Sequence, residues 1–378
     1  MKICHLIYDD VANPWLGGGG AVRAREIYRR LAERHEVTLI TGSFPGSRSD
    51  EVIDGIRHLR VGAAPSYARS RMSYCRRAID FLRALEWDVW VHEFSAFAPL
   101  WPRRALRRRG VLFFYHFVGR HALHKHPLVG PAAWAAETMT LQAYDRVVTI
   151  SPSVQEEVRD RRGNSAVVDC LFTGVEDSYF LLDSEEDADD PYVLYFGRLD
   201  IHTKGIDLLL SAFAQVSAQF PHVKLVLAGR SAADQRLRAQ QLIEAVGLQS
   251  RVILHGEGVV SEEEKGNLLR RCLFLCMPSR YEGWGIVAVE AAAAGKAVLG
   301  TRIPGLVDAI QEGETGYLVP PDDDSSLAEG MRQLLTRKDL RTSLGSAGRA
   351  WARRFDWDSI ARSQEDLLER AAQGKDRG

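Results

Sequence analysis

The chain has 378 residues, of which 46% are hydrophobic and 26% charged, and its formal net charge at pH 7 is −1. This length favours two domains over one, and the composition is that of an ordinary soluble globular protein. The near-zero charge argues against a nucleic-acid partner, and without a run of 18 apolar residues the sequence predicts no membrane-spanning helix.

Cysteine usage and the first residues bear on the compartment. The five cysteines are scattered, without pairs spaced as metal ligands. The opening stretch, MKICHLIYDD, is too short and too acidic for a signal peptide and is typical of a first strand. We therefore expect reduced thiols and a cytoplasmic protein.

Short apolar runs alternate with segments of helical periodicity along the chain. In the first half we expect strands at residues 2–8, 37–41, 89–91, 111–116 and 146–150. In the second half we expect strands at residues 192–196, 224–228, 252–255, 273–277, 297–300 and 316–319. Helical periodicity fills the intervals, for example over 23–34, 207–219 and 261–271. This alternation predicts an α/β protein with two doubly wound, Rossmann-like domains.

A strongly acidic stretch marks the expected domain boundary. The segment LLDSEEDADDPY (181–192) has almost no apolar content beyond its ends and cannot pack a core. We expect a first domain over 1–180, a linker over 181–190 and a second domain over 191–356. The tail has helical spacing of apolar residues, and we expect a helix over 357–378 that packs back on the first domain.

The stretch RYEGWGIVAVEAAAAG (280–295) combines two carboxylates with a glycine-rich turn. It follows an expected strand, and ligands bind beyond the carboxyl ends of strands in parallel sheets. Glu282 is therefore expected above the sheet, where Gly283 and Gly285 let the backbone approach a ligand and a helix start favours an anion. Glu290 stands alone in an apolar helix and needs a compensating partner.

Two further stretches carry charge or glycine at strand ends. In FGRLDIHTKGIDLLLSAF (196–213), Arg198 and Lys204 lie in the loop after a strand, and two cations there suit a diphosphate. Four consecutive glycines, 17–20, precede a helix. They lack the G-x-G-x-x-G spacing and the tight turn of a dinucleotide-binding fingerprint, so alone they indicate little.

In this order, the three stretches resemble the retaining, group 1 glycosyltransferases of family 4, which have the GT-B fold. The family patterns are a glycine pair before the first helix, then G-R-x(5)-K-G, then E-G-[FW]-G-x(4)-E. The matching positions are Gly18-Gly19, Gly197-Arg198 with Lys204-Gly205, and Glu282-Gly283-Trp284-Gly285 with Glu290. The resemblance covers nearly the whole chain and implies two Rossmann-like domains that face each other across a cleft.

The resemblance also implies roles for individual residues. Arg198 and Lys204 would bind the diphosphate of a nucleotide-sugar donor, Glu282 its hexose, and Glu290 its ribose hydroxyls. His116 would face the reaction centre. The implied catalytic residues are His116, Arg198, Lys204 and Glu282. The implied donor-binding residues are Gly18, Gly19, Arg198, Lys204, Glu282, Gly283, Trp284, Gly285, Ile286, Val287 and Glu290.

The expected activity is therefore retaining transfer of a hexose to a glycan, a lipid or a small molecule, with neither metal nor cofactor. Alternatives are a glycan synthase or phosphorylase on the same fold, an inactive sugar-nucleotide binder, and a nicotinamide-dependent oxidoreductase. The last lacks its fingerprint after the first strand. An inactive binder should lack one of Arg198, Lys204 or Glu282, and the sequence has all three.

Two residue groups allow other interpretations. The histidines at 116, 121, 124 and 126 could suggest a metal, but no cysteine or spaced carboxylate accompanies them, and we expect no site there. Asp322–Asp324 lie near a helix start and suit its dipole rather than a cation. Arginine-rich runs over 69–83 and 103–109 are usually solvated helix faces, with an anionic acceptor or peripheral membrane contact as the alternative.

Overall fold

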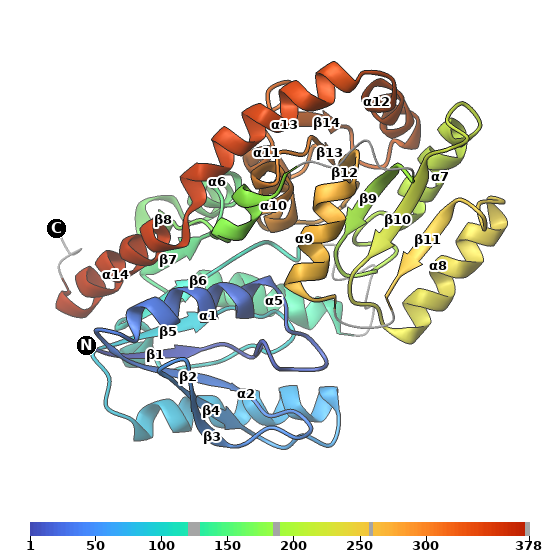
Figure 1. Ribbon diagram of the computed structural model, residues 1–378. Coiled ribbons are helices and arrows are strands. Elements are labelled where there is room, and N and C mark those ends of the chain that lie inside the picture. The colour runs from blue at the N-terminus through green and yellow to red at the C-terminus, as the bar shows by residue number, and fades with distance from the viewer. Residues whose placement is uncertain (120–128, 184–189, 257–259, 375–378) are drawn as a thin grey trace. The chain divides into compact units, whose positions relative to one another are not determined.

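The computed structural model describes residues 1–119, 129–183, 190–256 and 260–374 (Figure 1). It divides into two compact units, one formed by Met1–Gly174 with Trp357–Gly378 and the other by Val175–Asp356. The division falls before the acidic segment, because Val175 already pairs with the second unit. Its N–H donates to the Phe355 carbonyl at 2.8 Å. Of the expected histidine cluster, only His116 lies among the described residues. Of the expected linker over 181–190, only residues 181–183 and 190 are described.

Within the described residues, the sheet of the first unit has eight strands in the order β3-β4-β2-β1-β5-β6-β7-β8. They are β1 (Lys2–Leu6), β2 (Glu36–Gly42), β3 (Asp50–Ile53), β4 (Ile56–Val61), β5 (Val89–Glu93), β6 (Gly110–Phe113), β7 (Arg146–Thr149) and β8 (Val167–Cys170). All neighbours are parallel except β3 and β4. The β3–β4 hairpin and β8 were not expected from the sequence, and β6 ends three residues earlier than expected.

Helices cover the first sheet on both faces. They are α1 (Gly19–Leu31), α2 (Tyr67–Ala84), α3 (Arg104–Arg107), α5 (Gly130–Leu141), α6 (Pro152–Arg162), η1 (Gly163–Ser165) and α14 (Trp357–Gln373). Helix α2 packs on β2 and β4, and α14 packs along α1 (Figure 1). A buried contact joins α1 to α14, since the Arg23 guanidinium donates to Gln364 Oε1 at 2.8 Å. The C-terminal helix thus belongs to the first unit's core.

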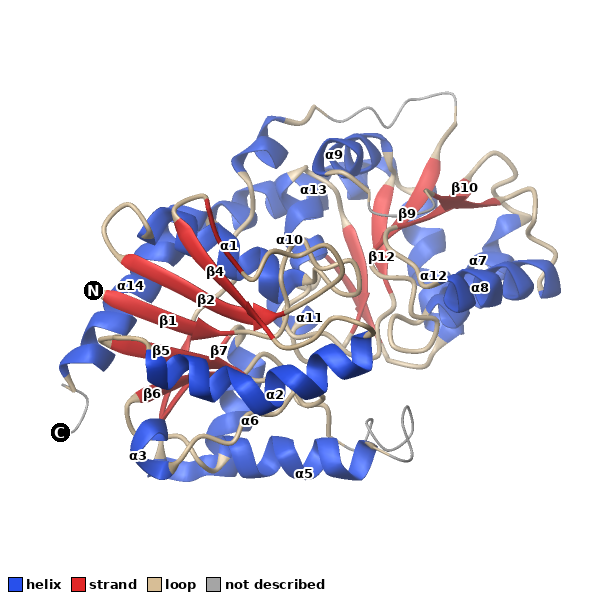
Figure 2. Ribbon diagram, turned by 90° about the horizontal axis from the view of Figure 1, so that it is seen from below, coloured by secondary structure: helices blue, strands red, loops and turns tan. Residues whose placement is uncertain are grey.

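The second unit holds a parallel sheet, with the described strands in the order β11-β10-β9-β12-β13-β14. They are β9 (Tyr192–Phe196), β10 (Lys224–Ala228), β11 (Val252–His255), β12 (Phe274–Met277), β13 (Val298–Thr301) and β14 (Gly316–Val319). The helical elements are η2 (Asp177–Leu181), α7 (Ile206–Ser217), α8 (Ala233–Ala245), α9 (Glu262–Arg271), α10 (Ile286–Ala293), α11 (Leu306–Ala309), α12 (Asp324–Thr336), α13 (Lys338–Ala352) and η3 (Arg353–Phe355). Helix α7 packs on α8 and α12 (Figure 2).

Sequence periodicity explains which face of α7 is buried. Ile206, Leu209, Leu210, Phe213 and Val216 recur at helical spacing and are all at most 1% exposed. This stripe packs into the core under β9 and β10, together with the apolar strands that read as continuous buried runs. This packing fixes the position of α7 on the sheet. It therefore also fixes the end of the preceding loop, which carries Lys204.

The order of strands in each sheet reverses at one point. In the second unit, the chain runs from β9 outward through β10 and β11, and then returns to the other side of β9 as β12. In the first unit, the same reversal lies between β1 and β5. Loops at such a reversal diverge and leave room above the sheet, where open α/β sheets bind their ligands. The loops after β9 and β12, and those after β1 and β5, are therefore the places for a site.

None of the helices among the described residues combines the length and apolar character that crossing a lipid bilayer demands.

Candidate functional site

The loop after β9 presents two cations. Arg198 is exposed, and its guanidinium makes no hydrogen bond or ion pair within the described part of the chain. Its backbone is held in place by Tyr195, whose hydroxyl donates to the Arg198 carbonyl at 2.9 Å. Lys204 is half-buried at the end of the loop, and Gly205, the residue before α7, adopts the left-handed conformation with φ +64°. The loop therefore offers one free guanidinium and one anchored ammonium.

The loop after β12 carries the first carboxylate of the sequence motif. Lys204 Nζ donates to Glu282 Oε1, and Ser279 Oγ donates to the same oxygen at 3.2 Å. The side chains of Lys204 and Glu282 are 16% and 14% exposed, so one face of the pair remains open to a ligand. The structure thus brings together two motif residues from loops on neighbouring strands, as the reversal of strand order requires.

Arg280 braces these two loops and was not singled out from the sequence. Its guanidinium donates to both oxygens of Asp207 on α7, at 2.8 and 3.0 Å, and to the His202 carbonyl at 2.7 Å. It also donates to Asp322 at 2.5 Å. Burial alone would lower the pKa of Arg280, but the two aspartates raise it, so the brace stays charged. The signal available in the sequence was only an arginine beside Glu282.

Packing fixes the turn that leads into α10. Trp284 is 3% exposed and meets Phe355 edge-on, with ring centroids 5.0 Å apart, so its side chain anchors the loop. Gly285 has φ +78°, and a Cβ there would lie 2.6 Å from Leu306 Cδ2. No side chain caps α10. The backbone from Gly283 to Val287, including Ile286, therefore presents an uncapped helix start to the space above the sheet.

Glu290 has a partner that the sequence analysis did not find. It is 6% exposed, and its Oε1 accepts a hydrogen bond from Lys265 Nζ on α9 at 2.6 Å. Burial raises the pKa of the Glu290 carboxyl, and the Lys265 ammonium opposes that rise. The expectation that ribose hydroxyls supply the missing compensation is therefore wrong for Oε1. Oε2 is buried and has no hydrogen-bond partner among the described residues.

In the first unit, the glycine loop is tied to Asp9. The Gly17 N–H donates to Asp9 Oδ1 at 2.9 Å and the Gly18 N–H to Oδ2 at 2.8 Å. Burial raises the pKa of Asp9, while these backbone donors lower it. In this conformation the Gly18 N–H is already used in a hydrogen bond to Asp9. The space around Gly19 is open, since a Cβ there would meet nothing within 4 Å. Only a rearranged loop could offer both expected amides to a phosphate.

A carboxylate at the end of β5 also escaped the sequence analysis. Glu93 accepts a hydrogen bond from the Tyr115 hydroxyl at 2.7 Å, and a Cβ at Gly20 would lie 2.6 Å from Glu93 Oε1. The Glu93 carboxylate therefore lies against Gly20 at the start of α1, and a side chain there would have to displace it. The next residue after Tyr115 is His116, which is exposed in the loop three residues beyond the end of β6. The candidate residues of the first unit thus also lie in loops at the carboxyl ends of its strands.

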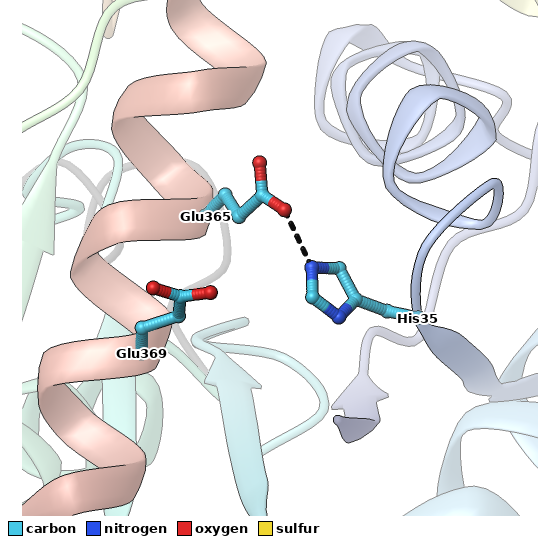
Figure 3. A group of neighbouring side chains, drawn as sticks. All are labelled: His35, Glu365 and Glu369. Atoms are coloured by element: carbon cyan, nitrogen blue, oxygen red, sulfur yellow. Dashed lines mark hydrogen bonds and ion pairs between the residues drawn. The ribbon is translucent and has the colours of Figure 1, made fainter.

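Among the described residues, one histidine–carboxylate group has ligand atoms close enough for a metal ion. It consists of His35, Glu365 and Glu369, whose ligand atoms lie within 4.8 Å of one another (Figure 3). Glu365 already contacts His35 Nε2 at 2.6 Å and Arg34 at 2.5 Å. Burial opposes ionisation of Glu365, but His35 and Arg34 hold its pKa below the ordinary value. The group is thus better described as an ion-pair network that fastens α14.

The aspartate triplet has structural partners. Asp323 accepts from the Ser326 N–H at 2.8 Å and caps α12, Asp322 pairs with Arg280, and Asp324 accepts from the Ser211 hydroxyl. Its position at a helix start is as expected from the sequence.

The basic run of α2 lies largely on a solvated face. Its exposed arginines are Arg69, Arg76, Arg77 and Arg83. Arg71 instead packs inward, over the rings of Tyr67 and Phe97 at 5.0 and 5.3 Å.

Comparison with known proteins gives consistent matches over both units. The family profile described as "Glycosyl transferases group 1" matches residues 182–351, and the profile "Glycosyltransferase Family 4" matches residues 17–179. The phosphatidyl-myo-inositol mannosyltransferase of Mycobacterium tuberculosis is 36% identical over 174 residues, which cover 45% of this chain and 44% of that protein. The chain spans about half the length of the curated relatives it matches.

Similar solved structures extend over nearly the whole chain. The sucrose-phosphate synthase of Thermosynechococcus elongatus has a TM-score of 0.81 at 22% identity, and the match covers 98% of both chains. HepE of Anabaena, solved in complex with UDP-glucose, has a TM-score of 0.73 at 18% identity, and the match covers 98% of this chain and 99% of that one. At these identities the likeness shows a shared fold.

Proposed function

The chain belongs to the group 1 glycosyltransferases of family 4, with the GT-B fold, and from that membership we propose that it transfers a sugar from a nucleotide-diphosphate donor to an acceptor. We further propose that the transfer retains the anomeric configuration and needs no metal ion or other cofactor. Its relatives include a mannosyltransferase and a sucrose-phosphate synthase by name, so the donor sugar and the acceptor stay open. A nucleotide-sugar donor is supported by HepE, which was solved with UDP-glucose.

One observation carries the proposal: the contact of Lys204 with Glu282 at the strand reversal between β9 and β12. A cation beside a carboxylate at the open edge of a sheet can hold both ends of a sugar diphosphate. In the proposed complex the ammonium faces the phosphate, and the carboxylate accepts hydrogen bonds from the hydroxyl groups of the sugar. A lone cation would bind phosphate without distinguishing a sugar, and a lone carboxylate would repel it.

The proposed chemistry depends on stabilising the departing diphosphate. Arg198 and Lys204 supply two positive charges, and the start of α10 adds about half a charge more. Such fixed donors stabilise charge that develops in the transition state without needing to reorganise. The proposal also assigns His116 and the glycine loop of the first unit to donor contact, as the family resemblance implies. No nucleophile with a partnered base is found among the described candidates, which favours front-face displacement over a covalent intermediate.

The test of the proposed function is a screen of sugar nucleotides for transfer and for slow donor hydrolysis. The purified protein should release the nucleoside diphosphate from one donor. The Arg198→Ala/Lys204→Ala double variant, prepared identically, should not, which controls for contaminating hydrolases. NMR coupling at the anomeric carbon of the product should show the donor's configuration. An inverted product would remove the retaining assignment, and a product formed only from a sugar phosphate would favour a phosphorylase.

Turnover is expected to be unchanged by excess EDTA. The charges of Arg198, Lys204 and the α10 start nearly balance a diphosphate, and the three aspartates after β14 are engaged by Arg280, Ser326 and Ser211. The measurement is the initial rate after chelation and gel filtration, with and without added Mg²⁺ or Mn²⁺. Loss of activity on chelation that Mn²⁺ restores would show that the fixed cations are insufficient.

A further inference from the structure

Lys265 is an unusual residue for its position. It lies on α9, yet its side chain is only 9% exposed, beside the equally buried Glu290 of α10. The ammonium also lies 5.4 Å from the ring centroids of Phe196, the last residue of β9, and of Tyr179 on η2. Burying two charges is costly, and replacing such a pair with apolar residues is often neutral or stabilising. Stability alone therefore gives a weak reason for this pair.

The pair is also incompletely satisfied. Lys265 reaches Glu290 Oε1 at 2.6 Å and Glu262 Oε2 at 3.4 Å, while Glu290 Oε2 is buried without a hydrogen-bond partner in the described part of the protein. A buried acceptor left unmade costs about 1–3 kcal/mol, more when it is charged. Such an atom calls for an explanation, and a functional role or a bound partner is one of the recurring ones. The contact of the Lys265 ammonium with Phe196 places the Lys265–Glu290 pair near the carboxyl end of β9, where the proposed donor site lies.

We propose that Lys265 is a positioning residue for the donor: it fixes Glu290 through Oε1 and keeps it anionic, so that Oε2 is presented to the hydroxyl groups of the nucleotide ribose. This inference rests on the proposed function and on the ribose-binding role that the family resemblance implies for Glu290, and it adds the residue that prepares Glu290. Lys265 itself touches neither phosphate nor sugar in this arrangement. Its effect on binding passes through the charge and direction of one carboxylate.

The charges around the pair show why the carboxylate depends on the ammonium. Burial alone lowers the pKa of Lys265, but Glu290 and Glu262 raise it above its ordinary value, so Lys265 is charged at neutral pH. Burial raises the pKa of Glu290, Glu262 raises it further, and only Lys265 lowers it. Among the described residues, Tyr179 is a further titratable neighbour; its hydroxyl donates to Glu262, and burial raises its pKa and keeps it neutral. Without Lys265, protonation of Glu290 would extend towards neutral pH.

The test is the affinity of the full chain for nucleoside diphosphates by titration calorimetry between pH 6 and 9. UDP, GDP and ADP are the probes, and the tightest binder is compared with its 2′-deoxy counterpart. The wild-type protein should prefer the ribonucleotide by about tenfold, as for loss of one hydrogen bond to a charged group. Lys265→Met should weaken its binding by roughly 10- to 100-fold at neutral pH and shrink that preference. Both should recover as the pH rises, because Glu290 regains its charge.

Two control variants separate positioning from mere packing. Lys265→Met/Glu290→Gln removes both charges, which avoids an unpaired buried ion, and should bind weakly without dependence on pH. If Lys265→Met alone does not fold, Lys265→Gln takes its place: it removes the charge but keeps a donor for Glu290 Oε1, and its affinity should likewise recover as the pH rises. Lys224→Met, in a surface pair with Asp190 at 2.9 Å, should bind as the wild type does. Circular dichroism and thermal unfolding check that each variant is folded.

The possible failures are distinct. If the wild-type protein binds no nucleoside diphosphate, the proposed function fails and this inference with it. If the wild type binds but Lys265→Met keeps its affinity and ribose preference at every pH, only the inference is wrong. A loss that is the same at every pH would assign Lys265 a packing role. A pH dependence that persists in the double variant would show that a group other than Glu290 titrates.

Discussion

Replacing Lys204 or Arg198 with alanine is expected to lower kcat by about 10²–10³, the usual cost of removing one preorganised donor to a developing negative charge. The two losses should differ in their origin. Arg198 is exposed and makes no ion pair among the described residues, so Arg198→Ala removes a charge and little else. Lys204→Ala also leaves Glu282 without its ammonium, so it should weaken donor binding as well. Steady-state kinetics with the donor found by screening measure both effects.

A matched control for these variants is Lys224→Ala. Lys224 also forms an ion pair in the second unit, with Asp190. It is the first residue of β10 and therefore lies at the opposite end of the strand from the proposed site. Exposed pairs of this kind contribute little, and its kcat should stay within about twofold of the wild type. Losses below about threefold for both Arg198→Ala and Lys204→Ala would contradict electrostatic stabilisation by this loop.

Most of the second unit could be predicted from its sequence because its strands, apart from the partly exposed β11, are largely buried. Four of its strands, β9, β10, β11 and β14, have the expected bounds; β12 starts one residue later than expected, and β13 is shifted by one residue. Continuous apolar runs between helical segments leave few alternatives. The site loops followed from the same logic, since they stand at strand ends. Lys204 and Glu282 were assigned to one site only through the family resemblance, and the parallel pairing of β9 with β12 explains their contact.

The first unit was harder to predict at its edges. Strand β3 is short, polar and mostly exposed, so it lacks the apolar run that marks a strand. The signal present was the turn Asp54-Gly55, where both residues have positive φ, 52° and 77°. An Asp-Gly pair between two strands is a hairpin signal, and it was overlooked. An edge strand forms through backbone hydrogen bonds to one neighbouring strand, and its amino-acid composition is therefore a poor predictor of its position.

Long-range side-chain contacts explain what the sequence could not show in the site. Lys265 and Glu290 are 25 residues apart, and Asp9 reaches Gly18 across a loop. In the sequence, Lys265 looks like an ordinary lysine on a helix surface, and Asp9 looks like an ordinary aspartate in a turn. The lone Glu290 in an apolar run did predict that a compensating group exists. Its identity depends on how α9 packs beside α10, which periodicity does not specify.

Gly205→Ala is expected to destabilise the second unit by about 2–5 kcal/mol. Gly205 has φ +64°, which costs a residue with a Cβ roughly 1–2 kcal/mol. A Cβ there would also lie 2.0 Å from the Pro278 carbonyl oxygen, at the start of the loop after β12. Backbone cannot swing aside as a side chain can, so the two loops must separate, at a cost of about 1–3 kcal/mol. Hydrogen exchange of β9 and α7 peptides in urea measures the free energy of opening.

Gly247→Ala is the matched control for this variant. Gly247 follows α8 with φ +70°, nearly the same backbone conformation, but a Cβ there would meet nothing within 4 Å. It should cost only the roughly 1–2 kcal/mol of the left-handed conformation. The difference between the two variants therefore isolates the close approach of the loop after β9 to the loop after β12. Because Lys204 precedes Gly205, separation of these loops should also pull its ammonium from Glu282, and Gly205→Ala should lose nucleotide affinity that Gly247→Ala keeps. Equal destabilisation by both substitutions would show that the loops yield freely and that their contact does not hold the site together.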